Sequence, residues 1–189
     1  ASFEIKNLNK NLIFTSQNAV LSILQHPTID QLKQKTVFCV GLKTKELLNE
    51  NGFTVEAYTG YAEDLAEIIT LVYSDESFTF FSGNLRRDTL PEMLSENEIT
   101  FNEIKVYDTT LTPQKISDKV DGILFFSPSA VTSYLKKNTL ANEKLFCIGN
   151  TTADSLRAVL SETKIKNIKT AYQPSVDNVI EQVIEYYNK

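Results

Sequence analysis

The sequence has few of the residues that build metal centres or histidine-dependent catalytic sites. Among its 189 residues there are one histidine, His26, and two cysteines. A Ser-His-Asp triad needs a histidine, and a histidine-rich metal centre needs several. His26 precedes Pro27, where we expect the first helix to stop, and we interpret it as a solvated residue at the helix end. Both classes of site are therefore excluded.

The sequence also has few arginines, no excess of positive charge and no long apolar run. The chain has only three arginines and a formal net charge of −5. Nucleic-acid-binding surfaces are strongly positive, so we expect no nucleic-acid partner. No apolar run approaches the roughly 20 residues that span a bilayer, and no secretory apolar segment precedes the first strand. We expect a cytoplasmic protein without a membrane partner.

Against this background, one segment occurs twice. Residues 13–24 (IFTSQNAVLSIL) match residues 124–135 (LFFSPSAVTSYL) without a gap, and residues 57–65 (AYTGYAEDL) align with residues 171–179 (AYQPSVDNV). Each copy of the first segment is a short apolar run, a polar corner and a helical pattern. That pattern predicts a strand that leads into the N-terminus of a helix. Its recurrence predicts an internal duplication.

The two cysteines occupy matching places in this repeat. Cys39 lies in VFCVG and Cys147 in LFCIG, both of which are apolar and strand-like. We expect both thiols to be buried and reduced, rather than metal ligands or nucleophiles. Equivalent positions in separate lobes would lie far apart, which argues against a disulfide between them.

Strands alternate with helices along the whole chain. This alternation predicts parallel sheets that are covered by helices on both faces, an α/β fold. The expected strand and helix pairs are 12–15 and 17–25, 36–40 and 43–51, 53–57 and 62–73, and 78–81 and 85–96 in a first lobe, then 122–126 and 129–137, 145–148 and 152–160, and 167–171 and 175–187 in a second.

Two further segments, residues 3–8 (FEIKNL) and 101–109 (FNEIKVYDT), alternate apolar and polar residues and are expected to be strands. We expect them to cross between the lobes and to pair as a two-stranded β linker. The predicted organisation is a linker strand at 1–8, a first lobe at 9–100, a linker strand at 101–111 and a second lobe at 112–189. Because the second lobe has three strand–helix units against four, a complete duplication predicts one further unit of roughly 30 residues before Ala1.

The corners after the strands carry hydroxyl, amide and glycine groups, and no His, Cys, Asp or Glu. In open α/β sheets ligands bind beyond the carboxyl ends of the strands, and helix N-termini favour anions. The corners therefore suit carboxylates or phosphates. Any one Ser or Thr alone is better explained as a plain N-cap, as we expect for Ser127 before Pro128, but the repeated set favours an anion site. The corner residues are Thr15, Ser16, Asn18, Gly41, Thr44, Ser82, Gly83, Asn84, Ser127, Ser129, Gly149, Asn150, Thr151 and Thr152.

Three further residues are weaker candidates. Arg86 and Arg87 follow one corner and could meet an acidic ligand, or could lie solvated in a first helical turn. Tyr107 lies on the predicted linker, where it is either a site residue or a packing residue.

Taken together, these segments resemble the uroporphyrinogen-III synthase family over essentially the whole chain. The resemblance rests on IFTSQNAV, CVGLKTKELLNENGFTV, FFSGNLRRDTL, KVYDT, LFFSPSAV, CIGNTTADSL and AYQPSVDNVIEQV, in this order. It implies two flavodoxin-like lobes joined by a two-stranded linker, with the active site between them.

The resemblance also implies a reaction in tetrapyrrole (haem) biosynthesis. Hydroxymethylbilane, a linear tetrapyrrole with eight carboxylates, would be cyclised to uroporphyrinogen III with loss of water and inversion of ring D. No metal or organic cofactor is implied, and we expect a monomer. Tyr107 is the residue that would assist departure of the substrate hydroxyl. The implied substrate contacts are Ser16, Thr44, Ser82, Gly83, Ser127, Ser129, Thr151 and Thr152.

Two alternatives to this function are considered. A non-catalytic two-lobe module that binds an anionic small molecule would keep the same corners without needing Tyr107. A flavin-binding protein of flavodoxin type would need an aromatic-flanked phosphate loop, and the chain has no tryptophan to flank one.

Overall fold

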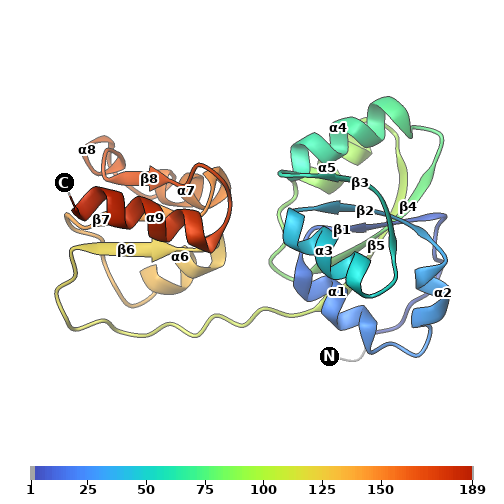
Figure 1. Ribbon diagram of the computed structural model, residues 1–189, viewed down its shortest axis with the longest axis horizontal. Coiled ribbons are helices and arrows are strands. Elements are labelled where there is room, and N and C mark those ends of the chain that lie inside the picture. The colour runs from blue at the N-terminus through green and yellow to red at the C-terminus, as the bar shows by residue number, and fades with distance from the viewer. Residues whose placement is uncertain (1–2, 189) are drawn as a thin grey trace. The chain divides into compact units, whose positions relative to one another are not determined.

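The computed structural model describes residues 3–188. The chain divides into two compact units, residues 1–109 (unit 1) and 110–189 (unit 2). Each unit is an α/β structure with a parallel sheet (Figure 1). None of the helices in the described range is long and apolar enough to cross a membrane.

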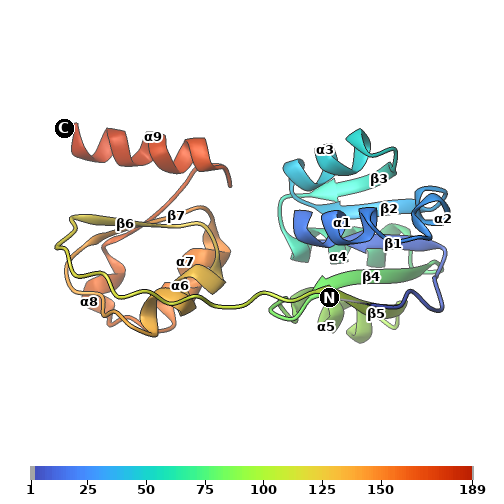
Figure 2. The same ribbon diagram turned by 90° about the horizontal axis from the view of Figure 1, so that it is seen from below.

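Unit 1 has strands in the order β3-β2-β1-β4-β5, with helices on both faces (Figure 2). Its elements are β1 (Asn11–Phe14), α1 (Gln17–Leu24), α2 (Ile29–Lys33), β2 (Thr36–Val40), α3 (Leu42–Glu50), β3 (Thr54–Thr59), α4 (Ala62–Val72), β4 (Ser77–Gly83), α5 (Thr89–Glu96) and β5 (Thr100–Tyr107). Side chains of α1 and α3 share one core with the sheet, and those of α4 and α5 share the core on the other face.

The central strands are mostly apolar because both of their faces are covered. Every residue of β1 is buried, with Leu12 and Phe14 in the core beside α1 and Ile13 in the core beside α4. Phe81 of β4 stacks on Phe14 with ring centroids 5.1 Å apart. Aromatic packing between neighbouring strands therefore fixes the centre of the sheet.

The strand order differs from the expected one. A flavodoxin-like sheet has the order 2-1-3-4-5, whereas unit 1 has 3-2-1-4-5, the order of the other common doubly wound sheet. The direction of winding reverses between β1 and β4. Apolar patterns identify strands but not their neighbours, which are chosen by long-range pairing.

The expected two-stranded linker is wrong. Residues 3–8 form no strand, and the segment expected at 101–109 is β5, which pairs in parallel with β4 as an edge strand of unit 1. The alternation in residues 3–8 nevertheless indicates which side chains are covered, because the apolar residues Phe3, Ile5 and Leu8 pack against the core beside α1. Alternation marks a segment with one covered face, and pairing is a separate, non-local property.

Unit 2 has a parallel sheet in the order β6-β7-β8. Its elements are β6 (Gly122–Phe125), α6 (Pro128–Leu135), β7 (Lys144–Cys147), α7 (Asn150–Arg157), α8 (Glu162–Ile165), β8 (Ile168–Thr170) and α9 (Val176–Tyr187). The repeated segments thus take the same order as β1, β2 and β3. No described residue pairs with the second edge of β6, and the expected further strand–helix unit, like the duplication itself, stays a prediction.

Both cysteines are buried and free, as predicted. Burial raises the pKa of the Cys39 thiol to about 11 and that of Cys147 to about 12. At pH 8 about one thiol in a thousand or fewer is then a thiolate, the reactive form. We expect iodoacetamide to leave both cysteines of the native protein unlabelled over a period that labels both in guanidinium. Rapid labelling of either one in the native protein would contradict the burial.

Candidate functional site

The carboxyl end of the unit 1 sheet brings together three of the predicted site residues. Ser16 follows β1, Gly83 ends β4 and Tyr107 ends β5. Winding reverses between β1 and β4, and ligands of doubly wound sheets bind beyond the strand ends at such a switch point. Topology alone therefore makes this edge the first place to look for a site.

Ser16 joins the start of α1 to Tyr107. Its backbone is extended, and its Oγ accepts the N–H of Ala19 at 3.2 Å, which makes it the N-cap of α1. The same hydroxyl donates to Tyr107 Oη at 3.0 Å. Because Tyr107 accepts this bond, its own phenolic proton remains available to a ligand.

Gly83 lies directly against the ring of Tyr107. A Cβ built on Gly83 would be 2.3 Å from Cζ and 2.7 Å from Oη of Tyr107, far inside van der Waals contact. The ring packs on bare backbone, so this glycine is required by a close approach. Gly83 thus acts on the tyrosine, and its expected contact with substrate stays a prediction.

An irregularity in the β4–β5 pairing places the side chain of Tyr107 on the face of the sheet that α1 covers. Ser82 pairs with Lys105 but Gly83 pairs with Tyr107, so Val106 is an extra residue. Consecutive strand residues normally face opposite sides, yet Val106 and Tyr107 both pack in the core beside α1. Without this β-bulge Tyr107 would face the opposite side of the sheet, away from Ser16.

An open pocket of about 510 Å³ lies beside this tyrosine. It is lined by Tyr107, Asp108 and Thr109 on one side, and on the other by the α1 residues Asn18, Leu21 and Ser22 and by Gln25, the C-cap of α1. Of these, only Asn18 and Tyr107 had been singled out. The spacing of the α1 residues is that of one helix face, which is the signal that could have identified the rest.

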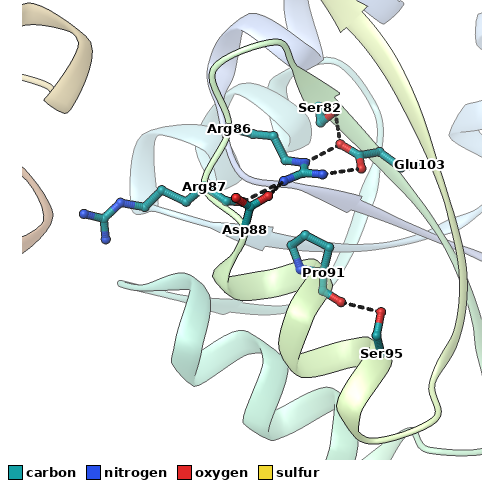
Figure 3. A network of polar contacts seen from close by, with 7 residues as sticks. All are labelled: Ser82, Arg86, Arg87, Asp88, Pro91, Ser95 and Glu103. Carbon is teal, nitrogen blue, oxygen red and sulfur yellow. Dashed lines mark hydrogen bonds and ion pairs between the residues drawn. The ribbon is translucent and has the colours of Figure 1, made fainter. Parts of the chain in front are cut away.

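Ser82, another predicted substrate contact, forms a hydrogen bond with Glu103 instead of facing this pocket. It is 2% exposed and donates to Glu103 Oε1 at 2.5 Å. Arg86 binds both oxygens of Glu103, through Nε at 2.5 Å and Nη2 at 2.9 Å, and also contacts Asp88 (Figure 3). A ligand could reach the Ser82 hydroxyl only by displacing Glu103. The predicted role of Ser82 as a substrate contact stays a prediction.

The same network corrects the expected start of the following helix. Helix α5 begins at Thr89, not at residue 85, so Arg86 does not lie in a first helical turn. Its N–H instead bonds the carbonyl of Gly83 at 3.2 Å, and its guanidinium turns back to Glu103. A polar turn held by an ion pair replaces the first helical turn that periodicity suggested.

The network predicts a pH-dependent stability. Burial raises the pKa of Glu103, but the bonds from Arg86 and Ser82 outweigh it and hold the pKa below its ordinary value. A lowered carboxyl pKa stabilises the fold above the unfolded value of about 4.3 and loses this effect as pH falls through the folded value. We expect Glu103→Gln to destabilise unit 1 by about 1.5–3 kcal/mol at pH 7 and by less at pH 3.

Urea unfolding at both pH values measures this difference. Exposed Glu67 on α4 gives the control, Glu67→Gln, for which we expect a change within about 0.5 kcal/mol at pH 7. A Glu103→Gln effect that is equal at pH 7 and pH 3 would refute the electrostatic explanation.

Unit 2 repeats the corner geometry of unit 1. Ser127 caps α6 by accepting the N–H of Ala130 at 3.1 Å, and Pro128 opens the helix, as predicted. Ser129 Oγ lies 3.0 Å from Ser127 Oγ. The bond from Ala130 to Ser127 has the same spacing as that from Ala19 to Ser16 in unit 1.

The predicted threonines also occupy matching places. Thr44 bonds Gly41, and Thr152 bonds Gly149, each from N–H to carbonyl oxygen at 3.1 Å. Both side chains are buried, at 5% and 2% exposure, whereas Thr151 is partly exposed. Within residues 3–188 no group of three or more His, Cys, Asp or Glu side chains is arranged to hold a metal ion.

Known proteins resemble this chain in sequence and in fold. The family model described as "Uroporphyrinogen-III synthase HemD" matches residues 2–181. Uroporphyrinogen-III synthase of Chlorobaculum parvum is 28% identical over 181 residues, with 82% of this chain and 73% of the relative covered. The crystal structure of uroporphyrinogen-III synthetase from Helicobacter pylori 26695 has the same fold, with a TM-score of 0.69 and 24% identity over 98% of this chain and 90% of that one.

Proposed function

Because the chain belongs to the uroporphyrinogen-III synthase family, we propose that it cyclises hydroxymethylbilane to uroporphyrinogen III. The family match over residues 2–181 is the observation that carries the proposal. The proposed reaction releases water from the terminal hydroxymethyl group and closes the macrocycle with ring D inverted. It needs no metal or organic cofactor.

Tyr107 is the proposed proton donor. The C–O bond of the substrate breaks, the leaving hydroxyl takes a proton to become water, and the pyrrole N–H loses one to give an azafulvene. Ser16 donates to Tyr107 Oη, which leaves the phenolic proton free and steadies negative charge that develops on the oxygen. The pocket that Tyr107 lines is where we place the reacting ring.

Uncharged donors are proposed to bind the eight substrate carboxylates. The first turns of α1, α3, α6 and α7 lie at the carboxyl ends of their sheets, and helix N-termini favour anions. Buried Thr44 and Thr152 would shape these turns, and the more exposed residues would contact the ligand directly. The proposed contacts are Ser16, Ser82, Gly83, Ser127, Ser129 and Thr151, with Thr44 and Thr152 behind them.

The azafulvene can also close unaided to the wrong isomer, so positioning is the main task of the protein. The test is therefore the isomer that forms. We expect the full chain, given enzymatically made hydroxymethylbilane without added cofactor, to yield isomer III after oxidation and chromatographic separation. Isomer I alone, as forms without protein, would overturn the proposal. Tight substrate binding with isomer I alone would instead identify a non-catalytic binding module.

A further inference from the structure

The chain that leaves β5 after Tyr107 is held by the residue that follows β4. Asn84 donates its backbone N–H to the carbonyl of Tyr107 at 3.3 Å. Its side-chain Nδ2 donates to the carbonyl of Thr109 at 3.2 Å, and the N–H of Thr109 donates to its Oδ1 at 2.7 Å. One residue thus makes three hydrogen bonds to a three-residue segment.

The side-chain amide of Asn84 takes the place of one further peptide unit of β4. Backbone pairing between β4 and β5 ends at Gly83 and Tyr107. An amide group offers one donor and one acceptor, as a peptide unit does, so Asn84 extends the pairing to Thr109. Because Asn84 is exposed, water competes for these bonds and their net effect on stability is small. Their effect is on where residues 107–109 lie.

The position matters because the bulge lies immediately before this contact. A slip of one residue would place Val106, rather than Tyr107, opposite Gly83, and would turn Tyr107 to the other face. The three bonds of Asn84 to the backbone of Tyr107 and Thr109 are made in the bulged register and so favour it. Thr109 also lines the pocket beside Tyr107, so the same contact fixes one wall of that pocket.

We propose that Asn84 is a positioning residue that holds the register of residues 107–109 and so keeps Tyr107 directed at Ser16. The kinetic consequence rests on the proposed function. Asn84→Ala is expected to lower kcat/KM for isomer III about tenfold, within the range caused by small misplacements.

A double-mutant cycle separates positioning from a general structural role. If Asn84 acts through Tyr107, Asn84→Ala in a Tyr107→Phe background should change the rate less than about twofold, because coupled residues are non-additive. The same tenfold loss in both backgrounds, or no loss in the wild type, would overturn the inference. Asn97→Ala is the matched control, since Asn97 Nδ2 also donates to a backbone carbonyl, that of Met93, at 2.8 Å. We expect the control to keep full activity.

A spectroscopic measurement tests the same inference without turnover. The chain has eight tyrosines, and ring-labelled tyrosine NMR identifies Tyr107 as the signal lost in Tyr107→Phe. Asn84→Ala should shift that signal, whereas Asn97→Ala should not. If Asn84→Ala does not fold, Asn84→Asp serves instead, because its carboxylate repels the Thr109 carbonyl that Asn84 binds. If the wild type makes no isomer III but the Asn84 variant still shifts the Tyr107 signal, the proposed function is refuted and the positioning role is not. If the Asn84 variant leaves the Tyr107 signal unshifted, the positioning role is refuted.

Discussion

Tyr107→Phe is expected to lower the rate of isomer III formation by about 10- to 100-fold. One positioned proton donor usually contributes at least this much, and the substitution removes only the hydroxyl that meets Ser16. The ring should still pack on Gly83, so the fold should be retained. Initial rates of isomer III formation, with spontaneous isomer I measured in the same samples, give the effect.

The control for this substitution is Tyr73→Phe in the same unit. The hydroxyl of Tyr73 likewise takes part in a side-chain hydrogen bond, which it donates to Glu56 Oε1 at 3.0 Å. Tyr73 packs on the face of the sheet opposite to α1 and Ser16. We expect it to keep the wild-type rate. Unchanged kinetics in Tyr107→Phe would remove Tyr107 from the mechanism.

Gly83→Ala is expected to reduce both rate and stability. The new methyl group would lie 2.3–2.7 Å from three atoms of Tyr107, so the ring or the strand must move. Overpacking of this kind costs about 1–3 kcal/mol, and a displaced hydroxyl should lose at least as much rate as Tyr107→Phe. Urea unfolding measures the first effect and isomer III formation the second.

Gly60→Ala controls for the loss of a glycine, because a Cβ at Gly60 would meet nothing within 4 Å. We expect it to match the wild type in rate. Removing the ring should relieve the clash, so Gly83→Ala should destabilise a Tyr107→Ala background much less than the wild type. An equal loss of stability in both backgrounds would mean that Tyr107 is not what Gly83 accommodates.

Local features of the fold were predictable because neighbouring residues produce them. The apolar run of β2 and the caps of α6 depend on side chains a few positions apart, and β2 was predicted to the residue. The short helices α2 and α8 were missed, since five and four residues are too few for a periodic signal. The misassignment of β5 has the opposite cause. An edge strand and a linker strand have the same alternation, and only pairing distinguishes them.

The sequence by itself determined the family, through the order of seven segments along the whole chain. It also determined the parallel α/β character, the buried thiols and the polar corners at the strand ends, because each of these depends on patterns read along a few consecutive residues. Only the tertiary structure decided which corners meet. Ser16 and Tyr107 are 91 residues apart in the sequence. The bulge that turns Tyr107 depends on the pairing of β5 with β4, and the hydroxyl of Ser82 in β4 is hydrogen-bonded to Glu103 in β5. Contacts of this kind arise from pairing between distant segments, for which no local pattern codes.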